Sequence, residues 1–374
     1  MANQVHRIQD LIGLIHALYP PMLAEEWDNV GLQVGDPKAR LDKVLIALDP
    51  TLGAVHAAAE LGAQALLTHH PLLFKPLSRL SREDTVGDIV WTAVEKNIAI
   101  ISAHTNLDSA ADGLNAWLAD TLGILDSQPL QPAKGDYLKL VVYVPFGHEA
   151  AVSEALFSGG AGHIGAYDHC SFRTAGTGTF RPGEGTSPFS GEIGRTEQAD
   201  EYRLETIVPR ARLSQVLDKL IRAHPYEEIA YDVFPLLNQA PKAGLGRIGR
   251  LQSPTSMDAF VDLVKDALCC NHLRVSGHEK QTIRKVAVCG GSGAALAAVA
   301  KFRGADILVT GDVKYHDARN AEDLGIGLID AGHFATERLM TTCIRESLTD
   351  ASRQRGWDID YHQYLREVDP FRIY

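Results

Sequence analysis

Apolar residues along the chain form two matching segments, residues 43–68 and residues 285–310, which have the same length. Each segment begins with a short apolar run, continues through an alanine-rich stretch that ends near a glycine, and closes with a second apolar run. This pattern is typical of a βαβ unit, in which a helix connects two parallel strands. The sequence therefore predicts an α/β core, duplicated as two similar βαβ-containing halves.

A third apolar run follows in each half and leads to a histidine. In the first half this histidine is His104, and Asp108 stands four residues later. In the second half it is His333, and Glu337 stands four residues later. The two halves thus carry a histidine and a carboxylate at the same offset, and the agreement extends the repeat beyond the βαβ segments.

The chain between the halves has a different pattern. Residues 137–145 and 201–209 read as strands, residues 211–223 read as a helix, and residues 229–234 read as a final strand. A helical stretch and a glycine-rich run at residues 176–194, which reads as a loop or hairpin, lie between the first two of these strands. With a hairpin strand there, the order is a plausible βαββαβ, as in ferredoxin-like domains. We therefore expect an α+β domain inserted into the α/β core.

The expected domain boundaries follow from this change in pattern. Residues 1–128 and 241–374 are predicted to form one discontinuous α/β metal-binding core, and residues 129–240 the inserted domain. A chain of 374 residues has room for two domains of ordinary size.

Composition narrows the class of protein. The formal net charge of -11 argues against binding to nucleic acid, which usually requires a concentrated basic face. No run approaches the roughly 20 apolar residues that span a bilayer, and the N-terminus lacks the pattern of an export signal. The 5 cysteines contain no CxxC pair, so neither a disulfide framework nor a thiolate zinc site is indicated. We expect a cytoplasmic protein that does not enter membranes.

Candidate metal ligands stand near the ends of the predicted parallel strands, where α/β proteins bind ligands. They are His69, His70, Asp108, His333 and Glu337. Adjacent side chains of an extended chain point to opposite sides, so the two neighbouring histidines suit two neighbouring ions. A helix that starts near Gly332 would place His333 and Glu337 on one face, and Asp108 has two oxygens with which to bridge the ions. Imidazole and carboxylate ligands favour zinc, manganese or iron.

Each of these residues also has a structural interpretation. A single histidine at a strand end is usually a hydrogen-bonded structural residue, and only the joint pattern favours a metal site. For His104, a role as proton carrier or as a partner of a ligand stands beside simple packing.

Two further motifs remain open at this stage. Residues 290–293 are rich in glycine and precede a helix, so they either cradle a phosphate or form a tight turn, and the turn is favoured. Asp312, with Lys314 and His316 just beyond it, could contact an anionic substrate. In the alternative interpretation Asp312 caps a helix and Lys314 is solvated. For Trp27, a packed side chain in a turn is the default interpretation.

At these residues the sequence resembles the Nif-three-like dinuclear metal centre family, whose members are labelled GTP cyclohydrolase I type 2 homologues. The segments that carry the resemblance are WDNVGLQ (27–33), THHP (68–71), HTNLD (104–108), TGDVKYHDA (310–318) and DAGHFATE (330–337). They occur in the order that the family shows, and the resemblance covers both halves of the core.

The resemblance implies two divalent metal ions per chain, held by the same five residues that the spacing selects. Residues 224–236 (HPYEEIAYDVFPL) are similar to the insert of longer members, which looks like the PII and CutA proteins. The resemblance to the family further implies a homo-oligomer, commonly a hexameric ring with the metal sites facing an internal cavity.

Three functions compete at this stage. The first is a metal-dependent hydrolase that acts on a nucleotide or another phosphate-containing small molecule. The second is a non-enzymatic regulator or metal-handling protein, in which a PII-like insert senses a ligand. The third is a phosphodiesterase of the Asp-His-His type, although Thr68 stands where that motif needs an aspartate.

Overall fold

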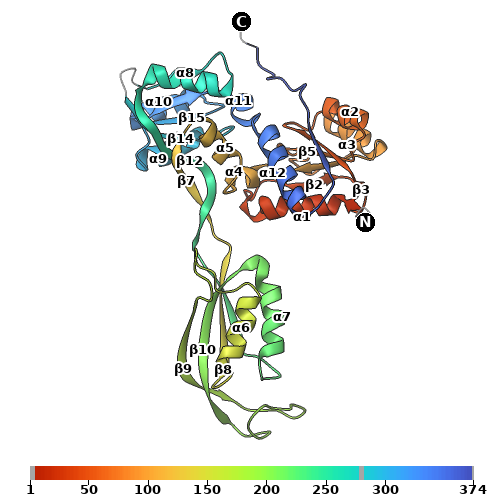
Figure 1. Cartoon of the computed structure of the whole chain (residues 1–374), viewed down its shortest axis with the longest axis vertical. Helices are drawn as coiled ribbons and strands as arrows, with labels where there is room; N and C mark the ends of the chain where they lie inside the picture. The colour runs from red at the N-terminus through yellow and green to blue at the C-terminus, as the bar shows by residue number, and fades with distance from the viewer. Residues whose placement is uncertain (1–4, 278–281, 373–374) are drawn as a thin grey trace. The chain divides into compact units, whose positions relative to one another are not determined.

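The computed structural model describes residues 5–277 and 282–372 (Figure 1). The chain forms two compact units. One unit is the core, which consists of Met1–Ala133 and Pro241–Tyr374, and the other is the inserted unit, Lys134–Ala240. The core holds both matching segments, so the two halves of the repeat belong to one body.

The first half of the core is built on a five-stranded sheet with the order β17-β4-β5-β6-β2. Its strands are β17 (Asp360–Gln363), β4 (Lys43–Ala47), β5 (Ala65–Thr68), β6 (Ala99–Ser102) and β2 (Gly31–Val34). Strands β17, β4, β5 and β6 are parallel, and β2 pairs with β6 in the antiparallel direction. The parallel strands therefore end at one edge of the sheet, beside which His69 and His104 follow.

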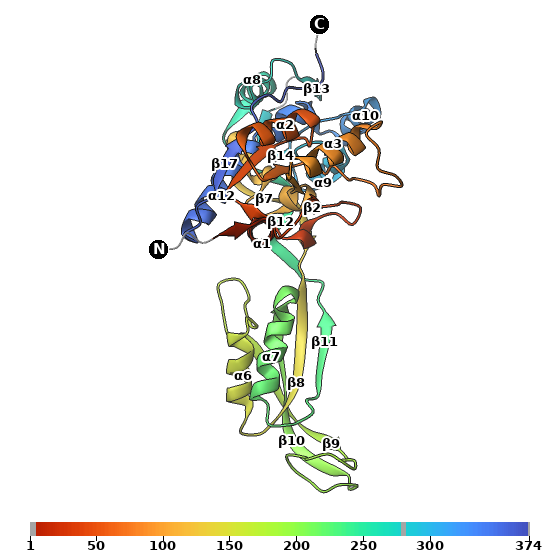
Figure 2. The ribbon, with the colours of Figure 1, turned by 90° about the vertical axis from the view of Figure 1, so that its right-hand side faces the viewer.

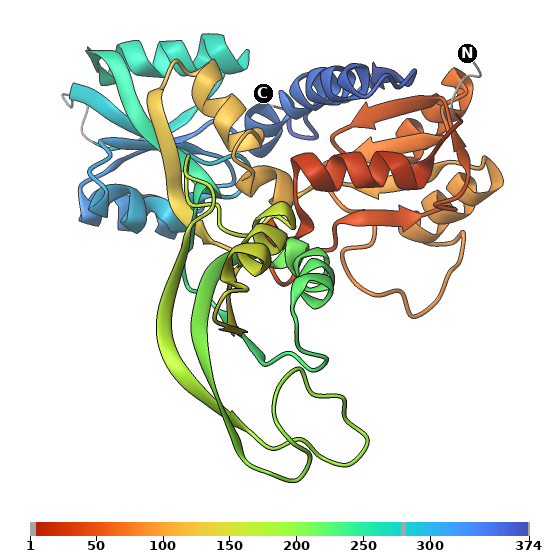
Figure 3. The ribbon, with the colours of Figure 1, turned by 60° about the horizontal axis from the view of Figure 1, so that its bottom comes forward.

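Helices cover both faces of this sheet. The helices α1 (Ile8–Leu18) and α12 (Met340–Gln354) pack with Ile46, Leu67 and Ile101 on one face, and Figure 3 shows them along the same side. The helices α2 (Leu52–Leu61) and α3 (Thr85–Glu95) pack on the opposite face. Because strands buried on both faces read as continuous apolar runs, the pattern of this half follows directly from its burial. Smaller elements are β1 (His6–Arg7), η1 (Pro21–Leu23) and β3 (Arg40–Leu41).

The second half is built on a six-stranded sheet with the order β13-β16-β15-β14-β12-β7. Its strands are β13 (Arg274–Ser276), β16 (Gly327–Asp330), β15 (Ile307–Thr310), β14 (Thr282–Val288), β12 (Gln239–Ser256) and β7 (Leu125–Lys134). Strands β14, β15 and β16 are parallel, whereas β12 and β13 run antiparallel to their neighbours. Both predicted βαβ units are thus present, each with a third parallel strand beside it.

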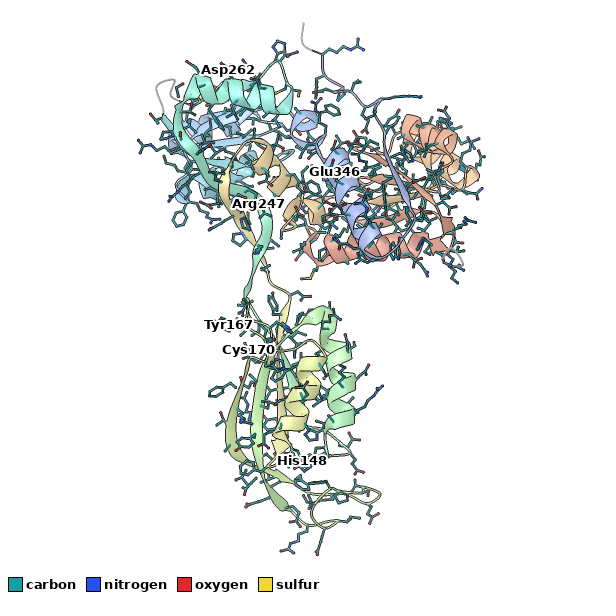
Figure 4. The ribbon with its side chains drawn as sticks, viewed as in Figure 1. His148, Tyr167, Cys170, Arg247, Asp262 and Glu346 are labelled. Atoms are coloured by element: carbon teal, nitrogen blue, oxygen red, sulfur yellow. The ribbon has the colours of Figure 1, made fainter. Side chains whose placement is uncertain are left out.

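Helices again lie on both faces. The helices α5 (Leu114–Thr121) and α8 (Met257–Leu268) pack on one face, and α9 (Ala297–Phe302) and α10 (Tyr315–Leu324) pack on the other. The 3-10 turn η3 (Ala294–Leu296) precedes α9. Two short helices follow equivalent strands of the two halves, α4 (Thr105–Ser109) after β6 and α11 (His333–Glu337) after β16. Arg247 on β12 (Figure 4) is buried and donates hydrogen bonds to the carbonyls of Ala110 and Ala111, which ties this sheet to the segment after α4.

The inserted unit has the element order β8-α6-β9-β10-α7-β11 (Figure 2). The elements are β8 (Tyr137–Pro145), α6 (Glu149–Ser158), β9 (Ser171–Phe180), β10 (Glu197–Pro209), α7 (Leu213–Ala223) and β11 (Tyr231–Pro235), with the 3-10 turn η2 (Arg210–Arg212) before α7. They form a four-stranded antiparallel sheet with the order β11-β8-β10-β9. Val142 and Leu204 pack with Leu156 of α6 and Val216 of α7, so the inserted unit has a hydrophobic core of its own.

Among the helices in the described part of the chain, none is long and apolar enough to cross a membrane.

Replacing Leu67 with alanine tests the packing of the first half. Leu67 is fully buried on β5, so Leu67→Ala is expected to reduce the free energy of unfolding by about 2–5 kcal/mol. Leu77 is 43% exposed, so Leu77→Ala is expected to change the free energy of unfolding by about 0.5 kcal/mol or less. Denaturant unfolding followed by tryptophan fluorescence reports on the core, because all 4 tryptophans belong to it. Equal effects of the two substitutions would contradict this description of the core.

Candidate metal centre

His69 and His70 follow β5 directly, at the carboxyl end of the first sheet. The backbone N–H groups of both residues donate to the carbonyl of Leu48, at 3.2 and 3.1 Å. The chain has therefore left the extended conformation, and the two rings lie 5.1 Å apart, centre to centre, tilted by 49°. The expectation that neighbouring side chains point to opposite sides is wrong here, because it assumed that the strand continues through both histidines.

His333 and Glu337 lie on α11, which begins directly after Gly332 as the spacing predicts. Nε2 of His333 is 2.9 Å from Oε2 of Glu337, one helical turn away. Nε2 of His70 lies 3.1 Å from the same oxygen. Two histidines from the two halves of the core thus meet on one carboxylate.

Asp108 lies on α4, in the place that Glu337 has in the second half. It is buried, and its Oδ1 is 3.5 Å from Nε2 of His69, which is also 3.7 Å from Oε1 of Glu337. The structure therefore brings together all five residues that the sequence selected as ligands.

Each of the four histidines at the site is hydrogen-bonded through Nδ1. His69 contacts the carbonyl of Ala103 at 2.9 Å, and His70 contacts Oδ1 of Asp49 at 2.8 Å. His104 contacts Oδ1 of Asp28 at 2.9 Å, and His333 contacts Oδ2 of Asp312 at 2.7 Å. Because these partners are oxygen acceptors, Nδ1 carries the hydrogen and a neutral ring has its lone pair on Nε2.

The cluster contains buried polar atoms that lack hydrogen-bond partners. In the described residues these include Nε2 of His69 and Oδ1 of Asp108. Nε2 of His333 also lies only 3.3 Å from Nε2 of His70. Buried polar groups without partners are costly, and lone pairs that face one another repel unless a cation or a proton lies between them. The donor atoms therefore fit a bound metal ion.

The charges at the site are strongly coupled. Burial favours the neutral form of Glu337, yet the surrounding histidines outweigh it and hold the pKa of this carboxyl well below its usual value. Burial also opposes protonation of His70, but its contacts with Asp49 and Glu337 raise its pKa to about 10. The hydrogen bond with Glu337 raises the pKa of His333 to about 9. The site thus stabilises positive charge next to its carboxylates.

The donor atoms fall into two groups that share Glu337. Its Oε2 faces His70 and His333, and its Oε1 faces His69, next to Asp108. From the sequence, Asp108 was expected to be able to bridge both ions through its two oxygens. In the structure it is the two oxygens of Glu337 that face different histidines, because this side chain comes from the second half and enters between His69 and His70.

His104 lies beside the cluster. Its ring is 5.1 Å from the ring of His69 and 5.5 Å from the ring of His70, and the three histidines form a candidate ligand group. Asp28 anchors it and also accepts a hydrogen bond from the backbone N–H of Thr105. Burial opposes ionisation of Asp28, but its hydrogen bonds with His104 and Thr105 outweigh burial and lower its pKa to about 2. The ionised carboxylate therefore holds the ring of His104 in a fixed orientation.

Sequence reasoning missed the acceptors that orient the histidines. Asp49 follows the apolar run of β4, and the backbone N–H groups of Leu48 and Asp49 donate to Glu367 near the C-terminus. Asp312 was considered as a helix cap, but its side chain bonds to His333, and Lys314 precedes α10. A polar residue after each strand was the available signal, although its partner lies far away in the sequence.

The glycine-rich run 290–293 serves the site as a turn. The backbone N–H groups of Gly290, Gly291 and Gly293 donate to side chains of the protein, so in this arrangement they are not directed at a phosphate. Gly291 has a φ of +59°, and a Cβ on it would overlap Oε1 of Glu337. A glycine at this position therefore gives the shared carboxylate its space.

The remaining candidates lie on the surface. Lys314 and His316 are exposed, and no contact with the five ligand candidates is found for them in the described residues. Trp27 is 57% exposed, so its interpretation as a packed side chain is wrong. Its ring lies 5.6 Å from that of Phe74 and 6.0 Å from that of His104, beside the cluster.

The chain is similar to known proteins over nearly its whole length. Residues 6–370 match the Duf34/NIF3 (NGG1p interacting factor 3) family. A protein of Halalkalibacterium halodurans called "GTP cyclohydrolase 1 type 2 homolog" is 41% identical over 97% of this chain and 98% of its own length. A Bacillus subtilis protein with the same name is 37% identical over 99% of both chains. The crystal structure of a Bacillus cereus protein related to NIF3 is 39% identical, covers 100% of both chains and superimposes with a TM-score of 0.87.

Substitution of Gly291 tests the shared carboxylate. Gly291→Ala is expected to displace Glu337 and to reduce metal binding at least about tenfold, because the added Cβ overlaps its carboxylate and the positive φ disfavours alanine. Gly62, which ends α2, has a φ of +71° and open space around it. Gly62→Ala therefore imposes the same backbone strain without the overlap and is expected to leave metal binding unchanged. Titration of chelator-treated protein with zinc compares the variants, and equal affinities would exclude this role for Gly291.

Metal binding is expected to release protons. The pKa values of His70 and His333, about 10 and about 9, mean that both rings hold protons at neutral pH when no metal competes. A metal ion binds only the deprotonated rings, so affinity should fall as the pH is lowered. Calorimetric titrations with zinc in buffers of different ionisation enthalpy measure the released protons. A binding enthalpy that is the same in all buffers would contradict the assigned charges.

Proposed function

The chain belongs to the Duf34/NIF3 family, and on this basis we propose that it is a metal-dependent hydrolase with a dinuclear centre. In this proposal Glu337 is shared by the two ions. His70 and His333 complete the ligands of one ion, and His69 and Asp108 those of the other. The observation that carries the proposal is the anchoring of every ring through Nδ1, which directs the four Nε2 atoms to one place.

The donor set favours zinc, manganese or iron. Imidazole nitrogens outnumber carboxylates among the candidate ligands, whereas calcium and magnesium prefer sites made of oxygen atoms. Five protein ligands for two ions leave coordination positions for water and substrate, as in catalytic sites. When bound, paired divalent ions supply Lewis-acid activation of water and stabilise negative charge on oxygen.

The chain's own residues then have distinct roles in hydrolysis. His104 is the proton carrier, since Asp28 fixes its ring and leaves its Nε2 beside His69 and His70. The exposed ring of Trp27, next to Phe74 at the same side, offers a surface on which a planar base can stack. We therefore propose a nucleotide or another phosphate-containing small molecule as substrate. The name of the relatives, "GTP cyclohydrolase 1 type 2 homolog", is consistent with a nucleotide.

The inserted unit is proposed to be ferredoxin-like, as in PII and CutA proteins. Its strand order β11-β8-β10-β9 places the first and third strands of the unit at the centre, which is the arrangement of that fold. A cytoplasmic homo-oligomer, such as the hexameric ring implied by the resemblance, also remains a proposal. The same holds for the alternative that the protein regulates or handles metal without catalysis, using the insert as a ligand sensor.

Metal content is the first test of the proposed centre. Protein purified without chelator is expected to contain about two ions per chain by elemental mass spectrometry, because the donor atoms form two groups and each group can hold one ion. His333→Ala and Asp108→Ala should each lower this content, because each removes a donor from a different ion. His316→Ala serves as the control, since this histidine is exposed and lies outside the donor groups. Metal content that none of the substitutions changes would refute the proposed centre.

Turnover separates the hydrolase from the metal-handling alternative. The metal-loaded protein is assayed with nucleoside triphosphates, including GTP, and with a chromogenic phosphodiester. His104→Ala is expected to reduce turnover by about a hundredfold or more, the usual contribution of a general acid or base, while metal content is retained. Metal-loaded protein without turnover on any of these substrates would favour the non-enzymatic alternative.

A further inference from the structure

The inserted unit contains a pocket of about 410 Å³, separate from the metal centre of the core. Residues from the end of β9, the loop that follows it, β10 and the segment after α7 line it. A volume of this order accommodates a small organic molecule. Nothing in the proposed hydrolase mechanism uses this pocket.

A buried carboxylate lines the pocket. Glu201 on β10 is only 8% exposed, and its Oε1 accepts a hydrogen bond of 2.8 Å from the hydroxyl of Tyr226. Among the described residues no hydrogen bond or ion pair involves its other oxygen, Oε2, and no cation pairs with the carboxylate. Burying a charge without a counter-charge is costly, so this side chain has spare capacity for a positively charged partner.

The neighbouring strand β9 leaves room for this carboxylate. Gly178 of β9 lies so close that a Cβ on it would overlap Oε2 of Glu201. Any other residue at position 178 would push the carboxylate away from its present place, unless the strand shifted. The glycine on the neighbouring strand therefore creates the space in which the buried charge lies.

Aromatic rings form the walls around the carboxylate. The ring of Tyr226 lies 5.8 Å from that of Phe189 and 6.5 Å from that of Phe180. The ring of Phe189 is 54% exposed and meets His148 (Figure 4) edge-on at 5.5 Å. Aromatic faces attract cations, and an acidic group surrounded by such rings is the usual arrangement for binding an organic ammonium or guanidinium group.

The charges of the lining residues agree with this chemistry. The lining contains three carboxylates, Glu201, Glu227 and Glu228, and one cationic side chain, Arg181. Glu227 accepts a hydrogen bond from the backbone N–H of Ser187, which fixes the loop that carries Phe189. The pocket is therefore negative overall and part of its wall is held in place.

We propose that this pocket binds a small organic cation that carries N–H donors, with Glu201 as its counter-charge. The ammonium or guanidinium group of this ligand donates a hydrogen bond to Oε2 of Glu201. The alkyl part of the ligand lies against Phe180 and Phe189. Burial and the neighbouring carboxylate of Glu201 raise the pKa of Tyr226, so its hydroxyl stays protonated and keeps Oε1 occupied. The incoming donor is thereby directed to the second oxygen.

Calorimetric titration of the full chain with agmatine, which carries both an amine and a guanidinium group, tests this proposal. We expect saturable binding with one site per chain. Glu201→Gln keeps the size of the side chain and removes its charge, and it should weaken binding at least about tenfold. Glu154→Gln is the matched control, because Glu154 lies on α6 of the same unit, is exposed and does not line the pocket.

A substitution in the aromatic wall and a ligand without N–H donors test the two parts of the proposed interaction separately. Phe189→Ala changes an exposed ring in a loop and leaves Glu201 in place, so it should weaken agmatine binding several-fold while the fold is retained. Tetramethylammonium, which has no N–H donor, should bind more weakly than agmatine. Absence of agmatine binding, or equal weakening by Glu154→Gln and Glu201→Gln, would overturn the proposal. Metal content of the core is measured in parallel, and it should be the same in all of these variants.

Discussion

The arrangement of the candidate centre depends on one property of the imidazole ring, which has two nitrogens but only one hydrogen when neutral. In each of the four histidines an oxygen acceptor contacts Nδ1, so Nε2 is the atom that faces the cluster. The acceptors come from separate segments, namely Ala103, Asp49, Asp28 and Asp312. The orientation of the donors is therefore a property of the whole core, not of the ligand residues alone.

The duplicated sheet explains how these segments meet. Parallel strands place their carboxyl ends at one edge, and the short helices α4 and α11 start there in the two halves. Asp108 and Glu337 consequently approach the histidine pair from different halves and are buried among apolar strands. Burial raises the pKa of Asp108 to about 6, which shows the cost of placing this carboxylate in the interior. A bound cation would offset that cost for both carboxylates.

Much of this arrangement could be predicted from the sequence. The repeat of apolar runs predicted both βαβ units, and the four-residue offset placed His333 and Glu337 on a helix that begins near Gly332. That Asp108 also lies on a short helix was not predicted. The orientation of the His69 and His70 rings could not be predicted, because it depends on two N–H groups that share the carbonyl of Leu48. The role of Gly291 in leaving space for the carboxylate of Glu337 could not be predicted either. Its role depends on Glu337, which is distant in the sequence and adjacent only in the fold.

The most direct test of the central claim is a crystal structure of the protein loaded with zinc or manganese, with diffraction recorded on both sides of the absorption edge of the metal. The account predicts two anomalous-scattering peaks that share Glu337. One should lie at His70 and His333, and the other at His69 and Asp108. A single peak elsewhere in the chain, or fully loaded protein without a peak at Glu337, would contradict the account.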